Sequence, residues 1–265
     1  MSVTTLPDGA GWEVDGVTFA FDFGPSPSAR QFSIRKPPDL FEMHVELGGR
    51  FAGGNIVELG IASGGGTALL ALLARPRHLI ACELDDEPVS ALADLIEERH
   101  LRGSVHPTYG IDQSDRRAVA AVVDAVLGDE AIDLVIDDAS HEYHATRASF
   151  EELFPRLRPG GVFVIEDWAA DYAYAVRIET ALRGSAETAA EVKRKLDAAN
   201  ADPRRPARAL PQLGVELLDV CGAAPEVVRG LSVNKHWISV ERGDAHLTGF
   251  RLDDHIRDHW GWLGD

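Results

Sequence analysis

The sequence predicts an α/β fold, a Rossmann-like doubly wound sheet of seven mostly parallel strands in an α/β/α sandwich. Two observations predict it. From Asn55 onward, short apolar runs of β type alternate with longer helical segments, which is typical of βαβ units with helices on both faces of a parallel sheet. The last two apolar runs, Pro225–Val233 and His236–Glu241, are joined only by Asn234-Lys235. That link is too short for a parallel crossover and suits an antiparallel hairpin.

The elements of the parallel part follow from hydrophobic periodicity. The expected strands are Asn55–Leu59, His78–Glu83, Ser104–Tyr109, Ile132–Asp137 and Gly161–Ile165. The expected helices between them are Gly65–Ala74, Glu87–Arg99, Asp115–Leu127 and Tyr143–Leu157. Their apolar residues recur at three- and four-residue spacing, as helices with one buried face require. A further polar segment, Ala186–Ala201, predicts an exposed helix that is either a lid or a solvated spacer.

The first fifty residues differ from the rest of the chain. Two short apolar runs flank Asp15-Gly16, a dipeptide suited to a tight hairpin turn. Pro37-Pro38 can open a helix through about Leu47, with Gly48 as its stop. We therefore expect an extension over 1–50, a main domain over 51–243 with a helical insertion or lid at 170–210, and a tail over 244–265.

Composition and charge exclude several classes of partner. The chain has 265 residues, 45% of them apolar, and its 26 basic and 43 acidic residues give a net charge of −17. Such a charge repels nucleic acids and anionic membrane surfaces. No run approaches the roughly 18 apolar residues of a membrane span. Cys82 and Cys221 lie in apolar surroundings that suit reduced thiols, which favours a cytoplasmic protein.

The residues after the first two strands suggest a nucleotide-containing cofactor. Glycines 60, 64 and 65 follow the first strand and allow a ligand to approach the backbone closely. Ala62 breaks the G-x-G-x-x-G pattern of dinucleotide-binding proteins. Glu83 ends the second strand, where a carboxylate can accept both ribose hydroxyls of a nucleoside or a dinucleotide.

Acidic residues crowd the ends of the fourth and fifth strands. These ends carry Asp137-Asp138 and Glu166-Asp167, and the two strands are expected to be neighbours. Asp138, Glu166 and Asp167 can therefore converge on one hard divalent cation, which would relieve their mutual repulsion. His141 would lie at the mouth of the cleft and suits a general base, with His144 as its nearest competitor.

Glu58-x-Gly60-x-x-x-Gly64 resembles the first motif of class I S-adenosylmethionine-dependent methyltransferases. The resemblance implies that the acidic group lies near the amino acid end of the cofactor and that Asp112 meets the adenine amino group. The alternative role of Asp112 is a helix cap, for which Ser114 is the better candidate. The candidate cofactor-binding residues are Glu58, Gly60, Gly64, Gly65, Glu83, Asp112, Gln113 and Asp137.

A second resemblance is sharper and covers about residues 55–167. The stretches Asp137-Asp138-x-Ser-His141, Phe150 to Gly161 and Ile165-Glu166-Asp167 look like the magnesium-dependent deoxysugar O-methyltransferases of macrolide biosynthesis, of the mycinamicin type. The resemblance implies that Asp138, Glu166 and Asp167 bind Mg²⁺ or another hard divalent cation. It also implies that Asp138 and His141 form the catalytic pair, with His141 as the base.

These residues together predict a metal-assisted O-methyltransferase that acts on a hydroxyl of a small molecule, a natural-product sugar or related metabolite. The sequence leaves open methylation of an amine, a metal-dependent enzyme of the cephalosporin-hydroxylase-like type, and a non-catalytic cofactor-binding subunit. Apolar groups in the N-terminal hairpin and in the tail at His259-Trp260-Gly261-Trp262 favour a homo-oligomer.

Overall fold

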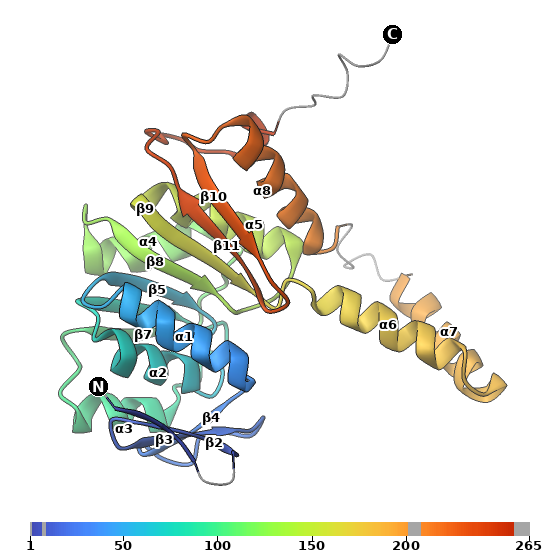
Figure 1. Cartoon of the computed structure of the whole chain (residues 1–265), viewed down its shortest axis with the longest axis horizontal. Coiled ribbons are helices and arrows are strands. Elements are labelled where there is room, and N and C mark those ends of the chain that lie inside the picture. The colour runs from blue at the N-terminus through green and yellow to red at the C-terminus, as the bar shows by residue number, and fades with distance from the viewer. Residues whose placement is uncertain (1, 7–8, 201–207, 257–265) are drawn as a thin grey trace.

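The computed structural model describes residues 2–6, 9–200 and 208–256. Its centre is a seven-stranded sheet in the order β10-β11-β9-β8-β5-β6-β7 (Figure 1). The strands are β5 (Asn55–Leu59), β6 (His78–Cys82), β7 (Val105–Thr108), β8 (Ile132–Asp137), β9 (Leu157–Glu166), β10 (Val228–Val233) and β11 (Trp237–Arg242). Strands β5 to β9 are parallel, and β11 runs antiparallel to both β9 and β10. The predicted fold class and its hairpin are therefore confirmed.

Helices cover both faces of this sheet. On one side lie α1 (Pro38–Arg50), α2 (Gly65–Ala74) and α3 (Ser90–Glu98), and on the other lie α4 (Arg116–Leu127), α5 (Tyr143–Leu153) and α8 (Pro211–Ala223). The sheet thus has two hydrophobic cores, a first under α1, α2 and α3 and a second under α4, α5 and α8. Alternate strand residues enter these two cores, so Ile56 packs in the first and Val57 in the second. Side chains of a strand point alternately to its two faces, which explains why both cores draw on the same strands.

Most predicted elements agree with the structure, and the differences have local causes. Helix α5 ends at Leu153, and a short 3₁₀ turn, Phe154–Arg156, follows it. Pro155 lacks a backbone N–H, so the predicted continuation to Leu157 was wrong.

The cap of α4 is Asp115, whose Oδ1 accepts the N–H groups of Arg117 and Ala118. The assignment of that cap to Ser114 was also wrong.

The N-terminal extension is a four-stranded sheet that packs into the first core. Its strands are β1 (Val3–Thr5), β2 (Gly11–Val14), β3 (Val17–Phe21) and β4 (Gln31–Ile34). The predicted Asp15-Gly16 turn joins β2 to β3 with φ values of 48° and 79°. Strands β1 and β4 were not predicted. Strand β4 pairs in parallel with β3 and leads the chain to the start of α1.

Gly48 does not stop α1, which continues to Arg50. A Cβ atom at Gly48 would lie 2.7 Å from the Cβ of Leu73 on α2, so the glycine allows these two helices to approach closely. The expected stop was therefore wrong, and the reason for glycine here is packing between helices rather than helix termination.

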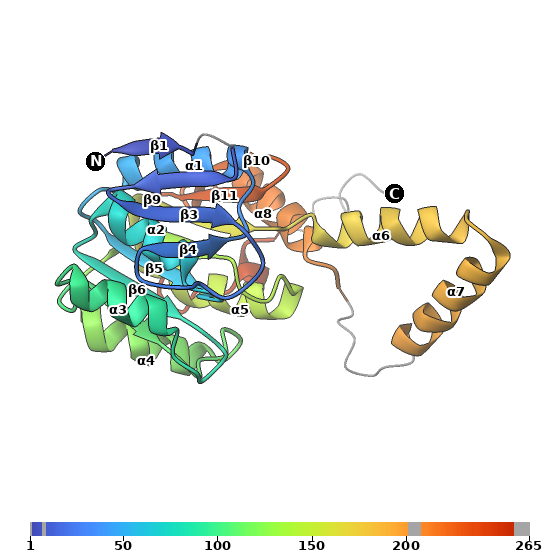
Figure 2. The same ribbon diagram turned by 90° about the horizontal axis from the view of Figure 1, so that it is seen from below.

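Two helices form an arm that extends away from the sheet (Figure 2). They are α6 (Ala170–Leu182), which directly follows β9, and α7 (Ala186–Asn200), which confirms the predicted helix. In this arrangement the arm does not cover the sheet. Among the described residues, no helix combines the length and apolar character needed to cross a bilayer. The tail at His259–Trp262 lies outside the described residues, so the subunit contact expected there stays a prediction.

Candidate functional site

The candidate site lies at the carboxyl ends of β5, β6, β8 and β9, where ligands bind in open parallel sheets. Two adjoining cavities occupy this edge. The outer cavity, of about 550 Å³, is lined by the ends of β5 and β6 and by the loops that follow β7 and β8. The inner cavity, of about 200 Å³, lies between the glycine loop (residues 60–65), β9 and the segment after β4. Both are lined by Gly60, Ala62, Asp138 and Ala139, so one elongated ligand can reach both.

The glycine loop needs its glycines for two close approaches. Gly60 has φ of 96°, and a Cβ atom there would lie 2.3 Å from the carbonyl oxygen of Asp138. A Cβ atom at Gly65 would lie 2.3 Å from the carbonyl oxygen of Ser33 in the N-terminal extension. Gly64 has φ of 83° and precedes α2. The loop is thus pressed against the end of β8 on one side and against the extension on the other.

Glu83 holds this loop in place. Its Oε2 accepts the backbone N–H groups of Ile61 and Ala62 at 2.9 and 2.8 Å. Its Oε1 accepts those of Leu84 and Asp85 at 2.8 and 3.2 Å. A carboxylate offers about four acceptor positions, so these donors fill them. Glu83 also lines the outer cavity, where the ribose contact was predicted.

Asp137 positions other residues of the site. Its carboxylate accepts the Gln113 amide at 3.1 and 2.9 Å and the Ser149 hydroxyl at 2.8 Å, and burial raises its pKa to about 6. Asp137 is 2% exposed and lines neither cavity, unlike Gln113, and its predicted cofactor contact stays a prediction. The Gln113 side chain in turn accepts the backbone N–H of Ser140. Asp112 is exposed at the mouth of the outer cavity and accepts the N–H of Ser114.

Glu58 lies at the base of the inner cavity and is almost completely buried. Its Oε2 accepts the Thr67 hydroxyl at 2.6 Å. Burial raises the pKa of Glu58 to about 8 against the opposing effect of this hydrogen bond. The side chain therefore carries a proton at neutral pH in the protein without ligand.

Glu166 contacts Lys36 and His44, two residues that were not predicted to belong to the site. Its Oε2 lies 2.7 Å from Lys36 Nζ, and its Oε1 lies 2.8 Å from His44 Nε2. Lys36 also contacts Asp138 Oδ2 at 3.0 Å. Burial opposes ionisation of Glu166, but Lys36 and His44 outweigh it and hold its pKa below the ordinary value. Burial likewise opposes the charge on Lys36, and the two carboxylates outweigh it and raise its pKa.

No local pattern distinguished these two residues in the sequence. Lys36 precedes Pro37-Pro38 and lies more than a hundred positions from Asp138 and Glu166. His44 lies on the buried face of α1, where its Nδ1 hydrogen-bonds the carbonyl oxygen of Leu40 at 2.9 Å. Only the packing of the extension against the ends of β8 and β9 brings them to the acidic residues.

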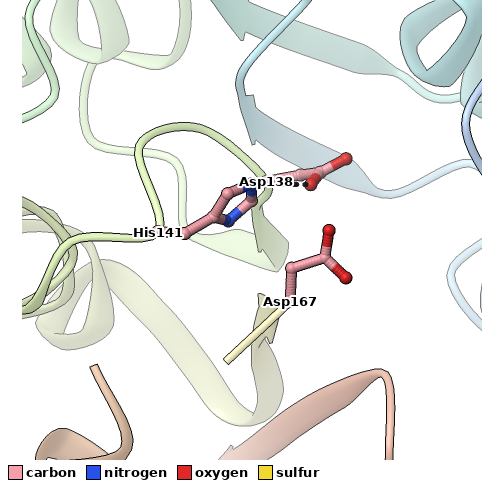
Figure 3. A group of neighbouring side chains, drawn as sticks. All are labelled: Asp138, His141 and Asp167. Carbon is pink, nitrogen blue, oxygen red and sulfur yellow. Dashed lines mark ion pairs between the residues drawn. The ribbon is translucent and has the colours of Figure 1, made fainter. Parts of the chain in front are cut away.

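Asp138, His141 and Asp167 form a group whose potential ligand atoms lie within 4.8 Å of one another (Figure 3). His141 Nε2 lies 3.9 Å from Asp138 Oδ1. His141 and Asp167 have φ values of 55° and 50°, a strained conformation that is common at functional sites. Two carboxylates beside an imidazole fit a divalent cation in their chemistry. This group contains two of the three predicted metal ligands, Asp138 and Asp167. The third, Glu166, is turned toward Lys36.

Comparisons with known proteins agree with this geometry. Residues 57–168 match a family described as a methyltransferase domain. Over 76 residues the chain is 42% identical to 8-demethyl-8-alpha-L-rhamnosyl tetracenomycin-C 2'-O-methyltransferase of Streptomyces olivaceus, covering 29% of this chain and 19% of that protein. It is 38% identical over 78 residues to mycinamicin VI 2''-O-methyltransferase of Micromonospora griseorubida, covering 23% and 20%. The matches span about a fifth of the length of these curated relatives.

Solved structures share the fold. A methyltransferase from the mycinamycin biosynthetic pathway, in complex with Mg and SAH, aligns over 78% of this chain and 48% of its own, with 23% identity and a TM-score of 0.50. A putative caffeoyl-CoA O-methyltransferase from Staphylococcus aureus aligns over 79% and 86%, with 15% identity and the same TM-score of 0.50. Residues 57–168, which carry the glycine loop and the acidic ends of β8 and β9, therefore match a methyltransferase domain in sequence, and the solved structures share the fold of the seven-stranded sheet.

Proposed function

We propose that this protein is an S-adenosylmethionine-dependent O-methyltransferase that methylates a hydroxyl group of a small molecule, a natural-product sugar or a related metabolite. The observation that carries the proposal is the pair of adjoining cavities with Asp138 at their junction and the Asp138–His141–Asp167 group beside it. The matched methyltransferase domain contains this group and the glycine loop. The named activities of the curated relatives support a hydroxyl on a sugar as the acceptor.

The cofactor would span both cavities. Its adenosine end occupies the outer cavity, where Asp112 lies at the mouth and Glu83 at the base. Glu83 would hold a ribose hydroxyl there, and its longest present hydrogen bond is the one from the Asp85 N–H at 3.2 Å. The amino acid end enters the inner cavity beside Glu58. This placement brings the sulfonium methyl group to the junction of the cavities, next to Asp138 and His141.

Methyl transfer forms an oxygen–carbon bond as the sulfur–carbon bond of the cofactor breaks, and S-adenosylhomocysteine leaves. His141 Nε2 accepts the proton of the acceptor hydroxyl, since a neutral alcohol is a poor nucleophile. We propose that Asp138, Glu166 and Asp167 hold a divalent cation here, with Glu166 joining once it is released from Lys36. Such a cation, when bound, supplies charge that favours the deprotonated hydroxyl.

The reaction itself is tested by measuring S-adenosylhomocysteine in the full-length protein with a panel of glycosylated natural products that carry free sugar hydroxyls. We expect one equivalent of S-adenosylhomocysteine for each equivalent of O-methylated product, identified by mass spectrometry. Binding of S-adenosylhomocysteine by calorimetry checks the site independently of the acceptor. A protein that binds neither S-adenosylmethionine nor S-adenosylhomocysteine contradicts the proposal, and turnover without S-adenosylhomocysteine indicates a different reaction.

Glu58 should make cofactor binding depend on pH. The pKa of Glu58, about 8, keeps its side chain protonated in the free protein at about pH 6. In the complex, the ammonium group of the cofactor would favour the ionised carboxylate of Glu58. Binding therefore releases a proton, and affinity for S-adenosylhomocysteine should rise with pH by up to about tenfold per unit until about pH 8.

Calorimetric titrations across this pH range check the dependence. Glu58→Gln keeps the shape of the side chain and should abolish the dependence. The exposed Glu87→Gln serves as the matched control and should retain it. A wild-type affinity that stays constant over the range shows that Glu58 does not change ionisation on binding.

Loss of the base should slow transfer without weakening cofactor binding. We use His141→Asn because asparagine tolerates the left-handed backbone at this position. General-base catalysis contributes about 10²–10⁴-fold, so kcat should fall by that factor while the dissociation constant for S-adenosylhomocysteine stays unchanged. The exposed His100→Asn is the control, because His100 has a similar φ of 56° and lines neither cavity, and its kcat should stay near wild type. Turnover of His141→Asn at the wild-type rate assigns the proton transfer to another group.

Removal of the cation should have a separate effect. Treatment with EDTA should lower the rate by about 100-fold or more, since a bound cation contributes several kcal/mol to charge stabilisation, and Mg²⁺ should restore it. Asp138→Asn should be slow and should respond little to added Mg²⁺. The exposed Asp129→Asn should behave as wild type. Full activity after exhaustive chelation removes the cation from the mechanism and leaves methyl transfer intact.

A further inference from the structure

A lysine from outside the matched methyltransferase domain reaches into the acidic group of the site. Lys36 lies between β4 and α1 and is 5% exposed. Its ammonium contacts one oxygen of each of two carboxylates, Asp138 Oδ2 at 3.0 Å and Glu166 Oε2 at 2.7 Å. These residues are two of the three that we propose as ligands of a divalent cation.

The backbone that carries Lys36 is fastened to the glycine loop. The Ser63 hydroxyl donates to the carbonyl oxygen of Ser33 at 3.1 Å, and the Ser26 hydroxyl donates to the carbonyl oxygen of Ser63 at 2.5 Å. Ser33 also meets Gly65 at the close approach described above. Because this segment is anchored, a change in the position of the ammonium must come from the flexible side chain, which itself lines the inner cavity.

The oxygens of Asp138 face two directions. Oδ2 faces Lys36, whereas Oδ1 lies on the side of His141, 3.9 Å from its Nε2. A divalent cation at Asp138 would therefore lie within a few ångströms of the ammonium, where two positive charges repel strongly in partly buried surroundings. Lys36 occupies one acceptor position of Glu166 Oε2, and its positive charge disfavours a cation on the same oxygen. Without Lys36, however, the buried Glu166 would lack much of its compensating charge.

We propose that Lys36 is an internal competitor of the divalent cation: its ammonium and the metal are alternative partners of the Asp138–Glu166 pair. Without metal, Lys36 compensates the two carboxylates. When metal binds, the ammonium leaves Glu166, which turns to the metal. The N-terminal extension thereby sets the metal affinity of the site. This inference rests on the metal-assisted function proposed above and deepens it by assigning a role to a residue outside the domain match.

Binding of Mn²⁺ tests the exchange without reference to catalysis. Metal-free, full-length protein is titrated with Mn²⁺ by calorimetry and by electron paramagnetic resonance, without cofactor or acceptor. Lys36→Met removes the charge and keeps an unbranched side chain, and it should bind Mn²⁺ tighter by about tenfold or more, or about 1.4 kcal/mol. Lys36→Arg keeps the charge and should stay within about threefold of wild type.

The exposed Lys193→Met on α7 is the matched control, because it changes the net charge equally but lies on the projecting arm. Its Mn²⁺ affinity should equal that of the wild type. Circular dichroism and the midpoint of thermal unfolding establish that each variant is folded. If Lys36→Met does not fold, Lys36→Gln carries the same expectation.

Three results would overturn the proposal: unchanged or weaker Mn²⁺ binding in Lys36→Met, equal tightening in Lys36→Met and Lys36→Arg, or no Mn²⁺ binding in any of these proteins. Each of them leaves the methyl transfer assay unaffected. Conversely, the wild-type protein could show no methyl transfer while Lys36→Met binds Mn²⁺ more tightly than wild type. That result contradicts the proposed function and supports the exchange. The two proposals can therefore fail separately.

Discussion

Burial of acidic side chains at one edge of the sheet is the constraint on which the rest of the site depends. Glu58, Asp137 and Glu166 are each at most 3% exposed, and a buried carboxylate without compensation is costly. Each is compensated differently. Glu58 keeps its proton, Asp137 accepts amide and hydroxyl donors, and Glu166 pairs with Lys36 and His44. The more exposed Asp138 and Asp167 remain the groups best placed to meet a ligand.

This constraint explains why the N-terminal extension belongs to the site. Strand β4 and the segment after it press against the glycine loop, where Gly65 leaves no room for a side chain. That contact delivers Lys36 to the ends of β8 and β9, and α1 delivers His44. The extension therefore contributes charge to a site whose other parts come from the matched domain. The arm of α6 and α7, by contrast, extends away from this edge (Figure 1).

Much of the fold could be predicted because its signals are local. The limits of β5, α2 and β8 agree with those expected, since short, largely apolar runs mark them in a few consecutive residues. Strands β1 and β4 were missed because they are short and their pairing depends on the β2–β3 hairpin between them in the sequence. The role of Gly48 was misassigned because packing between α1 and α2 depends on spatial neighbours, and the cap of α4 was placed one residue early, at Ser114 instead of Asp115.

The sequence by itself determined the alternation of strands and helices from β5 to β9, the glycine loop, and the placement of acidic residues and His141 at the ends of the strands. Parallel strands align their carboxyl ends, so sequence position after a strand suffices to locate a residue at that edge. Only the tertiary structure decided which acids face the cavities and what compensates them. Asp137 turned inward and Glu166 turned to Lys36, because charge compensation depends on distance in space, and Lys36 and Glu166 lie 130 residues apart in the chain.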